Sequence, residues 1–301
     1  MNRPIALIDI GTNTILQLIA RRADDGTFEV LDDRCVTARL GEGLKPGGTL
    51  APQAFERAVA IVADLLARAH ELGVRERDVW AAGTAVLRRA VDARVFIDAV
   101  RARTGLEVEV LSEADEGRLG FLAVTADGAG DEVWIVDVGG GSTEVVGESG
   151  ALRLSAPVGA VTLSAEVGAT HGDAASFERL LDHARAACER FPAAVLSADA
   201  QLVVLGGAVS NLACLDLELG AYDPLRAEGH VLDAGAALRE ARRLWPLSLE
   251  ERCKLPIEAD RAEILPAGLA CLGAALERLG AHRARVSGRG LRYGMARARF
   301  C

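Results

Sequence analysis

A glycine-rich turn between two apolar runs carries the most chemistry in this sequence. The stretch Val133–Val146 reads VWIVDVGGGSTEVV, and its apolar runs have strand length and many β-branched residues. Three glycines allow a sharp turn whose amide groups can approach an anion without a Cβ in the way. Ser142 and Thr143 add hydroxyl donors, while Asp137 and Glu144 add negative charge. This combination predicts phosphate held together with a divalent cation such as Mg²⁺; a plain hairpin turn is the simpler alternative.

The same pattern occurs near the N-terminus. Pro4–Ala20 reads PIALIDIGTNTILQLIA, in which an apolar run with Asp9 leads through a polar turn into a second apolar run. The polar residues of that turn are Thr12, Asn13 and Thr14. Each copy precedes a further strand-like segment, at residues 27–36 and 151–158. We therefore expect two similar halves, each opening with a three-stranded meander, and two facing turns that hold a phosphate chain.

The composition is that of an ordinary globular protein with two domains. The chain has 301 residues, of which 50% are hydrophobic and 26% are charged. The formal net charge of −9 argues against a general nucleic-acid-binding surface. No apolar run approaches the roughly 20 residues that span a bilayer, and the N-terminus lacks a signal-peptide core, so we expect a cytoplasmic protein without a membrane partner. The cysteines and histidines have no metal-ligand spacing, which predicts free, mostly buried thiols.

Two more strand ends in the first half carry polar residues. A strand at residues 78–82 runs into Gly-Thr and then a helix with Arg88, which either meets a phosphate at the sheet edge or lies solvated. A strand at residues 106–111 leads into Ser112-Glu113-Ala114-Asp115, a helix start that resembles a capping box. Glu116 is the next residue of this helix, and its carboxylate can hold a water at the sheet edge by general-base chemistry. We expect Glu113 and Asp115 to serve only the helix N-terminus.

The second half repeats this plan. An apolar strand at residues 201–205 ends in Gly206 and Gly207, which precede a helix. Such a turn permits close approach of an anion to the helix N-terminus. The polar, glycine-rich stretch at residues 125–131 predicts the boundary between an N-terminal domain of residues 1–125 and a C-terminal domain of residues 126–301.

With these motifs in place, the chain resembles the exopolyphosphatase / guanosine pentaphosphate phosphohydrolase (Ppx/GppA) family of the actin–Hsp70–sugar kinase superfamily. The resemblance rests on the ordered segments IDIGTNT, GLKPGGTLAPQAFERA, AAGTAVLRRA, LSEADEGR, VDVGGGSTE, LGGAVSNLA, DRAEILPAG and SGRGLRYG. It points to the short form of the family and implies an α/β fold of two ribonuclease-H-like (actin-like ATPase) domains. Each domain would have a mixed five-stranded sheet with helices, and the active site would lie in the cleft between them.

The resemblance also implies a reaction and residue roles. The reaction is Mg²⁺- or Mn²⁺-dependent release of terminal phosphate from polyphosphate, or of the 5′ γ-phosphate from guanosine pentaphosphate. Glu116 matches the catalytic base, and Arg88 matches the phosphate-binding arginine. Asp137 and Glu144 match the metal and water-positioning acids, and Asp9 joins them in the expected metal set. The expected phosphate-binding residues are Thr12, Asn13, Thr14, Arg88, Gly139, Gly140, Gly141, Ser142, Thr143, Gly206 and Gly207.

The sequence departs from the family pattern at the stretch Asp115-Glu116-Gly117-Arg118, which keeps the base, and at two positions that lose a positive charge. Leu16 stands where a basic residue is common, and Thr162 stands where an arginine is usual. Both remove positive charge near a bound polyanion, which predicts a narrowed range of polyphosphate lengths.

Two alternatives stay open: an ATP-dependent small-molecule kinase of the same superfamily, and a non-catalytic sensor of guanosine polyphosphates. Family members are often homodimers, but the sequence itself carries no interface signal.

Overall fold

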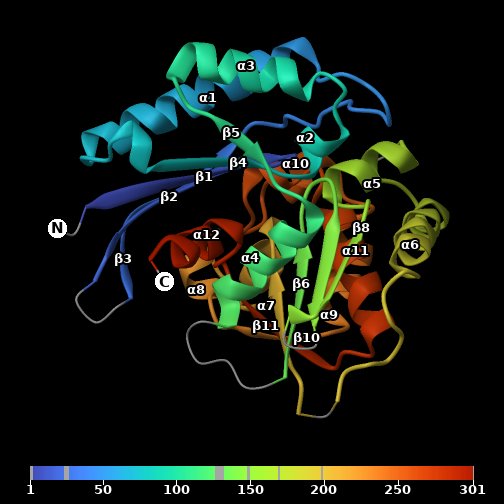
Figure 1. The fold of residues 1–301 in the computed structure, drawn as a ribbon. Coiled ribbons are helices and arrows are strands. Elements are labelled where there is room, and N and C mark those ends of the chain that lie inside the picture. The colour runs from blue at the N-terminus through green and yellow to red at the C-terminus, as the bar shows by residue number, and fades with distance from the viewer. Residues whose placement is uncertain are drawn as a thin grey trace. The chain divides into compact units, whose positions relative to one another are not determined.

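The computed structural model describes residues 3–23, 27–125, 132–147, 150–168, 170–197 and 199–300. The chain divides into two compact units, one of Met1–Ala126 with Leu291–Cys301 and one of Asp127–Gly290 (Figure 1). The sequence assigned the last residues to the second domain, whereas helix α12 (Leu291–Phe300) belongs to the first unit. The reason is that its apolar residues pack on the first sheet. The boundary expected at residues 125–131 falls, apart from Thr125, outside the described residues.

The first unit is built on a mixed five-stranded sheet with the order β3-β2-β1-β4-β5. The strands are β1 (Pro4–Ile10), β2 (Thr14–Arg22), β3 (Phe28–Thr37), β4 (Val79–Gly83) and β5 (Val108–Val110). Strands β1 to β3 form the expected antiparallel meander, while β4 runs parallel to β1 and β5 runs parallel to β4. Because parallel strands end at the same edge, this sheet gathers the residues that follow β1, β4 and β5 at one place.

Helices cover both faces of the first sheet. They are α1 (Pro52–Glu71), α2 (Ala85–Arg89), α3 (Ala93–Thr104), α4 (Glu113–Thr125) and α12, with a 3₁₀ turn at Glu76–Asp78. Ile8 and Ile10 pack in a cluster with apolar residues of α1 and α3, while Leu7 packs in a cluster with Leu119 of α4 and residues of α12. Side chains alternate along a strand, so Asp9 lies on the face that α4 and α12 cover.

The second unit has a six-stranded sheet with the order β10-β11-β9-β6-β7-β8. The strands are β6 (Val133–Val138), β7 (Thr143–Gly147), β8 (Leu152–Ala156), β9 (Gln201–Leu205), β10 (Val231–Asp233) and β11 (Arg283–Val286). The meander β6–β8 repeats that of the first unit, and β9 runs parallel to β6. The prediction of five strands in this half is wrong, because the three-residue edge strand β10 is too short to show a periodicity.

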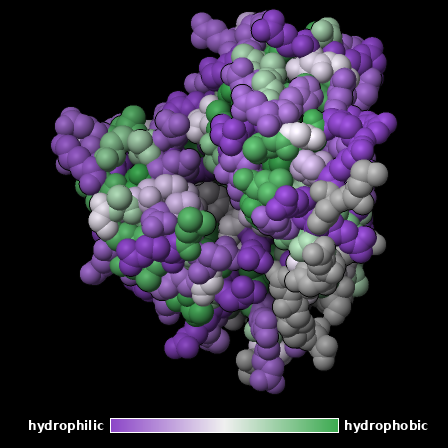
Figure 2. Space-filling model, turned by 90° about the vertical axis from the view of Figure 1, so that its left-hand side faces the viewer, coloured by the Kyte–Doolittle hydropathy of each residue, from purple (hydrophilic) through white to green (hydrophobic). Residues whose placement is uncertain are grey.

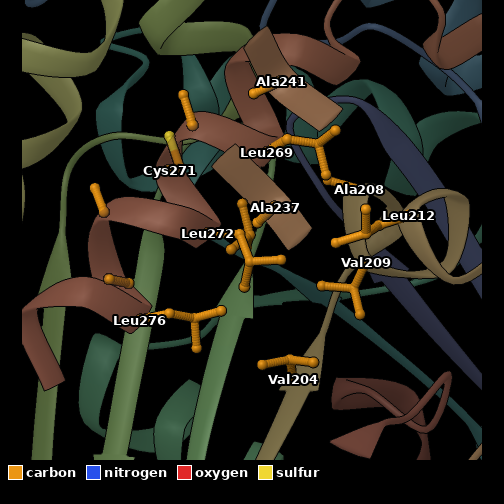
Figure 3. Close-up of a cluster of buried hydrophobic side chains, with 14 of the residues drawn as sticks. Val204, Ala208, Val209, Leu212, Ala237, Ala241, Leu269, Cys271, Leu272 and Leu276 are labelled. Atoms are coloured by element: carbon orange, nitrogen blue, oxygen red, sulfur yellow. The ribbon is translucent and has the colours of Figure 1, made fainter. Parts of the chain in front are cut away.

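A buried helix, α11, organises the core of the second unit. The helices are α5 (Ala160–Val167), α6 (Ala174–Cys188), α7 (Gly207–Asp216), α8 (Pro224–Ala227), α9 (Ala236–Leu244), α10 (Leu249–Arg252) and α11 (Leu265–Leu279), with a 3₁₀ turn at Ala259–Arg261. Nearly all side chains of α11 are buried, and α5, α6, α7 and α9 pack around it. Figure 3 shows this core, with Leu269, Leu272 and Leu276 of α11 among side chains of α7, α9 and β9.

The surface hydropathy and the state of the cysteines can be compared with what the sequence predicts. Hydrophilic residues cover much of the face in Figure 2, and hydrophobic residues appear there as separate patches. Among the described helices, none combines the length and apolar character needed to cross a membrane. The described cysteines are free, with Cys188, Cys214 and Cys271 buried and Cys35 and Cys253 exposed.

Candidate active site

The two polar turns are closed by corresponding backbone hydrogen bonds. The amide of Gly11 donates to the carbonyl of Thr14 at 3.0 Å, and the amide of Gly139 donates to the carbonyl of Ser142 at 2.9 Å. In each unit the aspartate, Asp9 or Asp137, stands two residues before that glycine. The internal repeat predicted from the sequence is therefore present in the structure, in register.

The loop after β3 donates hydrogen bonds to the carbonyl groups of the first turn. The carbonyl of Thr12 accepts a hydrogen bond from the amide of Gly41 at 2.9 Å. The carbonyl of Asn13 accepts two, from the amides of Ala38 and Arg39 at 2.9 and 2.7 Å. A Cβ on Gly41 would lie 2.3 Å from the methyl group of Thr12, so only glycine fits here. The loop after β3 thus fixes the turn through its acceptors and leaves its hydroxyl and amide donors for a ligand.

The second turn is held in the same way by the start of α5. The carbonyls of Gly139 and Gly140 accept hydrogen bonds from the first amides of that helix, at 2.8 to 3.1 Å. A Cβ on Gly159 would lie 2.5 Å from the carbonyl oxygen of Gly139. Among the described residues, none accepts a hydrogen bond from the amides of Gly140, Gly141 or Ser142. Such free amides in a tight turn form a concave anion site.

Thr162 has a structural role in this arrangement. Its hydroxyl accepts a hydrogen bond from the amide of Gly159 at 2.8 Å, and the residue is buried. Thr162 therefore supports the glycine turn and adds no positive charge.

Two carboxylates stand side by side in the second unit. Asp137 of β6 pairs directly with Glu144 of β7, and Glu144 pairs with Ser155 of β8. The hydroxyl of Ser155 donates to Glu144 Oε1 at 2.9 Å, and Glu144 is only 8% exposed. Opposite residues on adjacent strands share one face of a sheet, so two negative charges are close together there. In the first unit the residue paired with Asp9 is Leu16, so that turn has one acid where the second has two.

The two acids of the second unit fit a magnesium ion of the kind that phosphate-binding enzymes use. The described residues contain no group of three or more histidine, cysteine, aspartate or glutamate side chains arranged to cage a metal. Mg²⁺ does not need such a cage, because it commonly takes one or two carboxylates and completes its shell with waters and substrate phosphates. Asp137 and Glu144 supply such a pair.

The turn between β9 and α7 is built for close packing. Gly206 has φ of +110°, and a Cβ there would lie 2.2 Å from the carbonyl oxygen of Val138. A Cβ on Gly207 would meet the guanidinium of Arg261, which donates to the carboxylate of Glu258 and is 13% exposed. An anion that reaches the start of α7 would meet this cation. Arg261 lies in the segment DRAEILPAG, whose sequence alone predicts no role for it, because only the fold places it against Gly207.

The first unit brings Arg88 and Glu116 into direct contact. Arg88 Nη1 donates to Glu116 Oε2 at 2.6 Å and to the carbonyl of Leu111 at 2.9 Å. Their side chains are 19% and 17% exposed, so the solvated alternative for Arg88 does not hold. Burial raises the pKa of Glu116; Arg88 opposes this shift without cancelling it, and the charge of Glu113 adds to it. A carboxylate with a raised pKa at a sheet edge is suited to accept a proton from water.

The start of α4 matches the expectation for its other acids. The amide of Asp115 donates to Ser112 Oγ at 3.1 Å, and both Glu113 and Asp115 are exposed. They serve the helix N-terminus, while Glu116 alone turns inward to Arg88.

Comparison with known proteins places this geometry in one family. The model of the Ppx/GppA phosphatase family matches residues 18–298. "Exopolyphosphatase 2" of Mycobacterium tuberculosis is 29% identical over 277 residues, which cover 88% of this chain and 87% of the relative. The crystal structure of the Aquifex aeolicus Ppx/GppA family member is 28% identical, with a TM-score of 0.80, over 99% of this chain and 98% of that chain.

A further structure supports the fold alone. An exopolyphosphatase from Cytophaga hutchinsonii is 21% identical and has a TM-score of 0.83 over 99% of this chain and 98% of its own. These neighbours have the two-domain actin-like fold that the two mixed sheets display here. The chain therefore belongs to the Ppx/GppA phosphatase family.

Proposed function

We propose that the protein is an exopolyphosphatase-type phosphohydrolase. It releases terminal phosphate from inorganic polyphosphate, the 5′ γ-phosphate from guanosine pentaphosphate, or both. The observation that carries the proposal is the half-buried pair of Glu116 and Arg88 at the edge of the first sheet. The exopolyphosphatase name of the M. tuberculosis relative supports the substrate class.

The residues divide the work of phosphoryl transfer between them. This reaction needs neutralisation of phosphate charge and a nucleophile placed in line, with little covalent chemistry from the protein. Arg88 and the turn donors, including Asn13 and Ser142, bind phosphate oxygens. Glu116 orients the attacking water and accepts its proton. When Arg88 turns to a phosphate oxygen, Glu116 Oε2 loses the donor that it has here and becomes an acceptor for water.

We further propose that Asp137 and Glu144 hold Mg²⁺ or Mn²⁺. The metal supplies positive charge to the phosphate oxygens, which offsets the overall negative charge of the protein. Asp9 belongs to the expected metal set, but with Leu16 as its cross-strand neighbour it provides a single carboxylate.

Asp137→Asn is expected to weaken the metal dependence. We expect the Mg²⁺ concentration for half-maximal phosphate release to rise by at least about tenfold, because metal affinity falls by about 10- to 100-fold even when an outer-shell partner is lost. Mn²⁺ binding measured by electron paramagnetic resonance should weaken in parallel. Asp115→Asn is the matched control, since that acid is exposed at the start of α4. Equal Mn²⁺ affinity of Asp137→Asn and the wild type would contradict the metal assignment.

Phosphate release should be measured with Mg²⁺ from long-chain polyphosphate, tripolyphosphate and guanosine pentaphosphate in parallel. We expect the two short substrates to react faster than the long chain, because Leu16 and Thr162 supply no positive charge for a long polyanion. Faster release from long chains would contradict this length preference. No release from any of the three by the folded protein would overturn the proposed function.

A further inference from the structure

Helix α12 lies against helix α4, which carries Glu116. Figure 1 shows the two helices side by side, although they are far apart in the sequence. Leu291, Met295 and Ala296 of α12 are buried in one apolar cluster with Leu119 of α4 and with side chains of the first sheet. The position of α4 on that sheet is therefore set in part by the last helix of the chain.

Gly294 determines how closely the two helices approach. A Cβ at this position would lie 1.9 Å from the carbonyl oxygen of Leu119 and 2.6 Å from its carbonyl carbon. Both are backbone atoms, which cannot rotate away as the end of a side chain can. Any residue larger than glycine must move one helix relative to the other. Leu119 lies one helical turn after Glu116, so such a movement displaces Glu116 as well.

An ion pair fixes α12 to the edge strand of the same sheet. Arg292 donates two hydrogen bonds to Asp33 of β3, at 2.7 Å to Oδ1 and 3.0 Å to Oδ2, and the Tyr293 hydroxyl donates to Oδ2 at 2.8 Å. The Arg292 side chain is 12% exposed. Burial alone would lower the pKa of Arg292, but the hydrogen bonds and charge of Asp33, with a contribution from Asp9, raise it. A bidentate pair of this kind fixes orientation as well as distance.

We propose that α12 is the element that positions Glu116, with Gly294 setting its distance from α4 and Asp33 holding it in place through Arg292 and Tyr293. These are positioning residues, since they act through α4. The inference rests on the proposed function, in which Glu116 accepts the proton of the attacking water. According to this inference, the packing of α12 on the first unit contributes to catalysis as well as to stability.

Gly294→Ala tests the distance. We expect kcat for the fastest substrate of the panel to fall by about 10²-fold with KM nearly unchanged, because a misplacement of about 1 Å costs a rate of this order. We also expect the acid limb of the kcat/KM profile to move to lower pH, because a displaced Glu116 is less buried while Arg88 and Glu113 remain its charged neighbours. A purely structural role would lower stability without moving this limb.

Gly120→Ala is the matched control. Gly120 lies on α4, and a Cβ there would meet nothing within 4 Å. It should keep the wild-type kcat and pH profile. A folded Gly294→Ala protein with the kcat and acid limb of Gly120→Ala would overturn the proposal.

Asp33→Asn tests the attachment of α12 without adding an atom to the core. It removes the charge that Arg292 needs but keeps an oxygen that can accept from Tyr293, and we expect a fall in kcat of about tenfold with the same direction of pH shift. Its control is Asp32→Asn, because Asp32 accepts from Arg34 and Arg68 and side chains alternate along β3. Equal kcat values for the two variants would overturn the proposal even if Gly294→Ala fails to fold.

Glu116→Gln, assayed in parallel, separates the two hypotheses. If the wild-type protein releases no phosphate from any substrate, the proposed function fails. If Glu116→Gln hydrolyses the substrate at the wild-type rate, the phosphohydrolase activity stands, but Glu116 is not the base and α12 has no base to position. If it is inactive while Gly294→Ala and Asp33→Asn behave as their controls, the proposed function stands and the inference about α12 fails.

Discussion

Glu116→Gln is expected to lower kcat by about 10²- to 10⁴-fold while leaving substrate binding nearly intact, because it removes a general base and keeps its shape. Glutamine still offers an oxygen to Arg88, so the contact between α2 and α4 survives. The loss should appear in kcat for every substrate of the panel. Phosphate release at the wild-type rate would rule out Glu116 as the base.

The fold of this variant is not expected to suffer. Burial raises the pKa of Glu116 in the folded protein, so the folded state binds the proton more tightly than the unfolded chain does. That contribution to stability is present at low pH and is lost as the pH rises through the raised pKa. At neutral pH the ionised carboxylate therefore costs stability, and a neutral glutamine removes the cost. We expect the Tm at neutral pH to be no lower than that of the wild type.

The pH dependence of kcat/KM, measured for the wild type and for the control variant Glu113→Gln, tests the same assignment. Since the base must be ionised, kcat/KM of the wild type should fall on the acid side with an apparent pKa above the value of about 4.3 for an ordinary glutamate. Glu113→Gln, an exposed position on the same helical turn, should keep turnover. It removes a negative charge that raises the pKa of Glu116, so the acid limb of this control should move to lower pH.

The features predicted well from the sequence are those that local residues decide. Asp9, Gly11 and the hydroxyls that follow recur around Asp137, and the repeat is visible because a tight turn needs glycine and a phosphate needs donors within a few positions. The start of α4 is equally local, because Ser112 caps the amide of Asp115 three residues later. These turns and the start of α4 were predicted for that reason.

The features that the sequence did not predict depend on long-range contacts. The sequence LRYGMARARF of α12 does not predict which sheet the helix packs on, because its apolar residues would fit either core. Arg261 acquires its place over Gly207 only when the 3₁₀ turn and α7 pack together. In both cases the residues are ordinary for their segment and their partners are distant in sequence.

Arg252 is the extreme example of a residue whose role the sequence conceals. It stands in the polar segment LEER, yet it is 1% exposed, and within the described part of the chain its hydrogen-bond acceptors are all main-chain carbonyl groups. Its guanidinium donates at 2.6 to 3.2 Å to the carbonyls of Thr170, Leu244, Trp245, Ala262 and Glu263. It thereby joins the loop before α6, the end of α9, α10 and the segment before α11. Burial lowers the pKa of Arg252 to about 10, so the group is still charged at neutral pH.

Arg252→Met is expected to lower the free energy of unfolding of the second unit by about 3–5 kcal/mol, because several buried carbonyls lose their donor at once. Methionine fills part of the space but donates nothing. The measurement is urea unfolding followed by tryptophan fluorescence, to which the buried Trp134 and Trp245 of this unit contribute. The midpoint should fall while the slope of the transition stays unchanged.

Arg239→Met is the control, since Arg239 makes an ion pair with Asp233 in which both side chains are over 60% exposed. If the two variants unfold at the same urea concentration, the buried guanidinium does not hold these four segments together, and the stability of this unit rests on the apolar core around α11 alone.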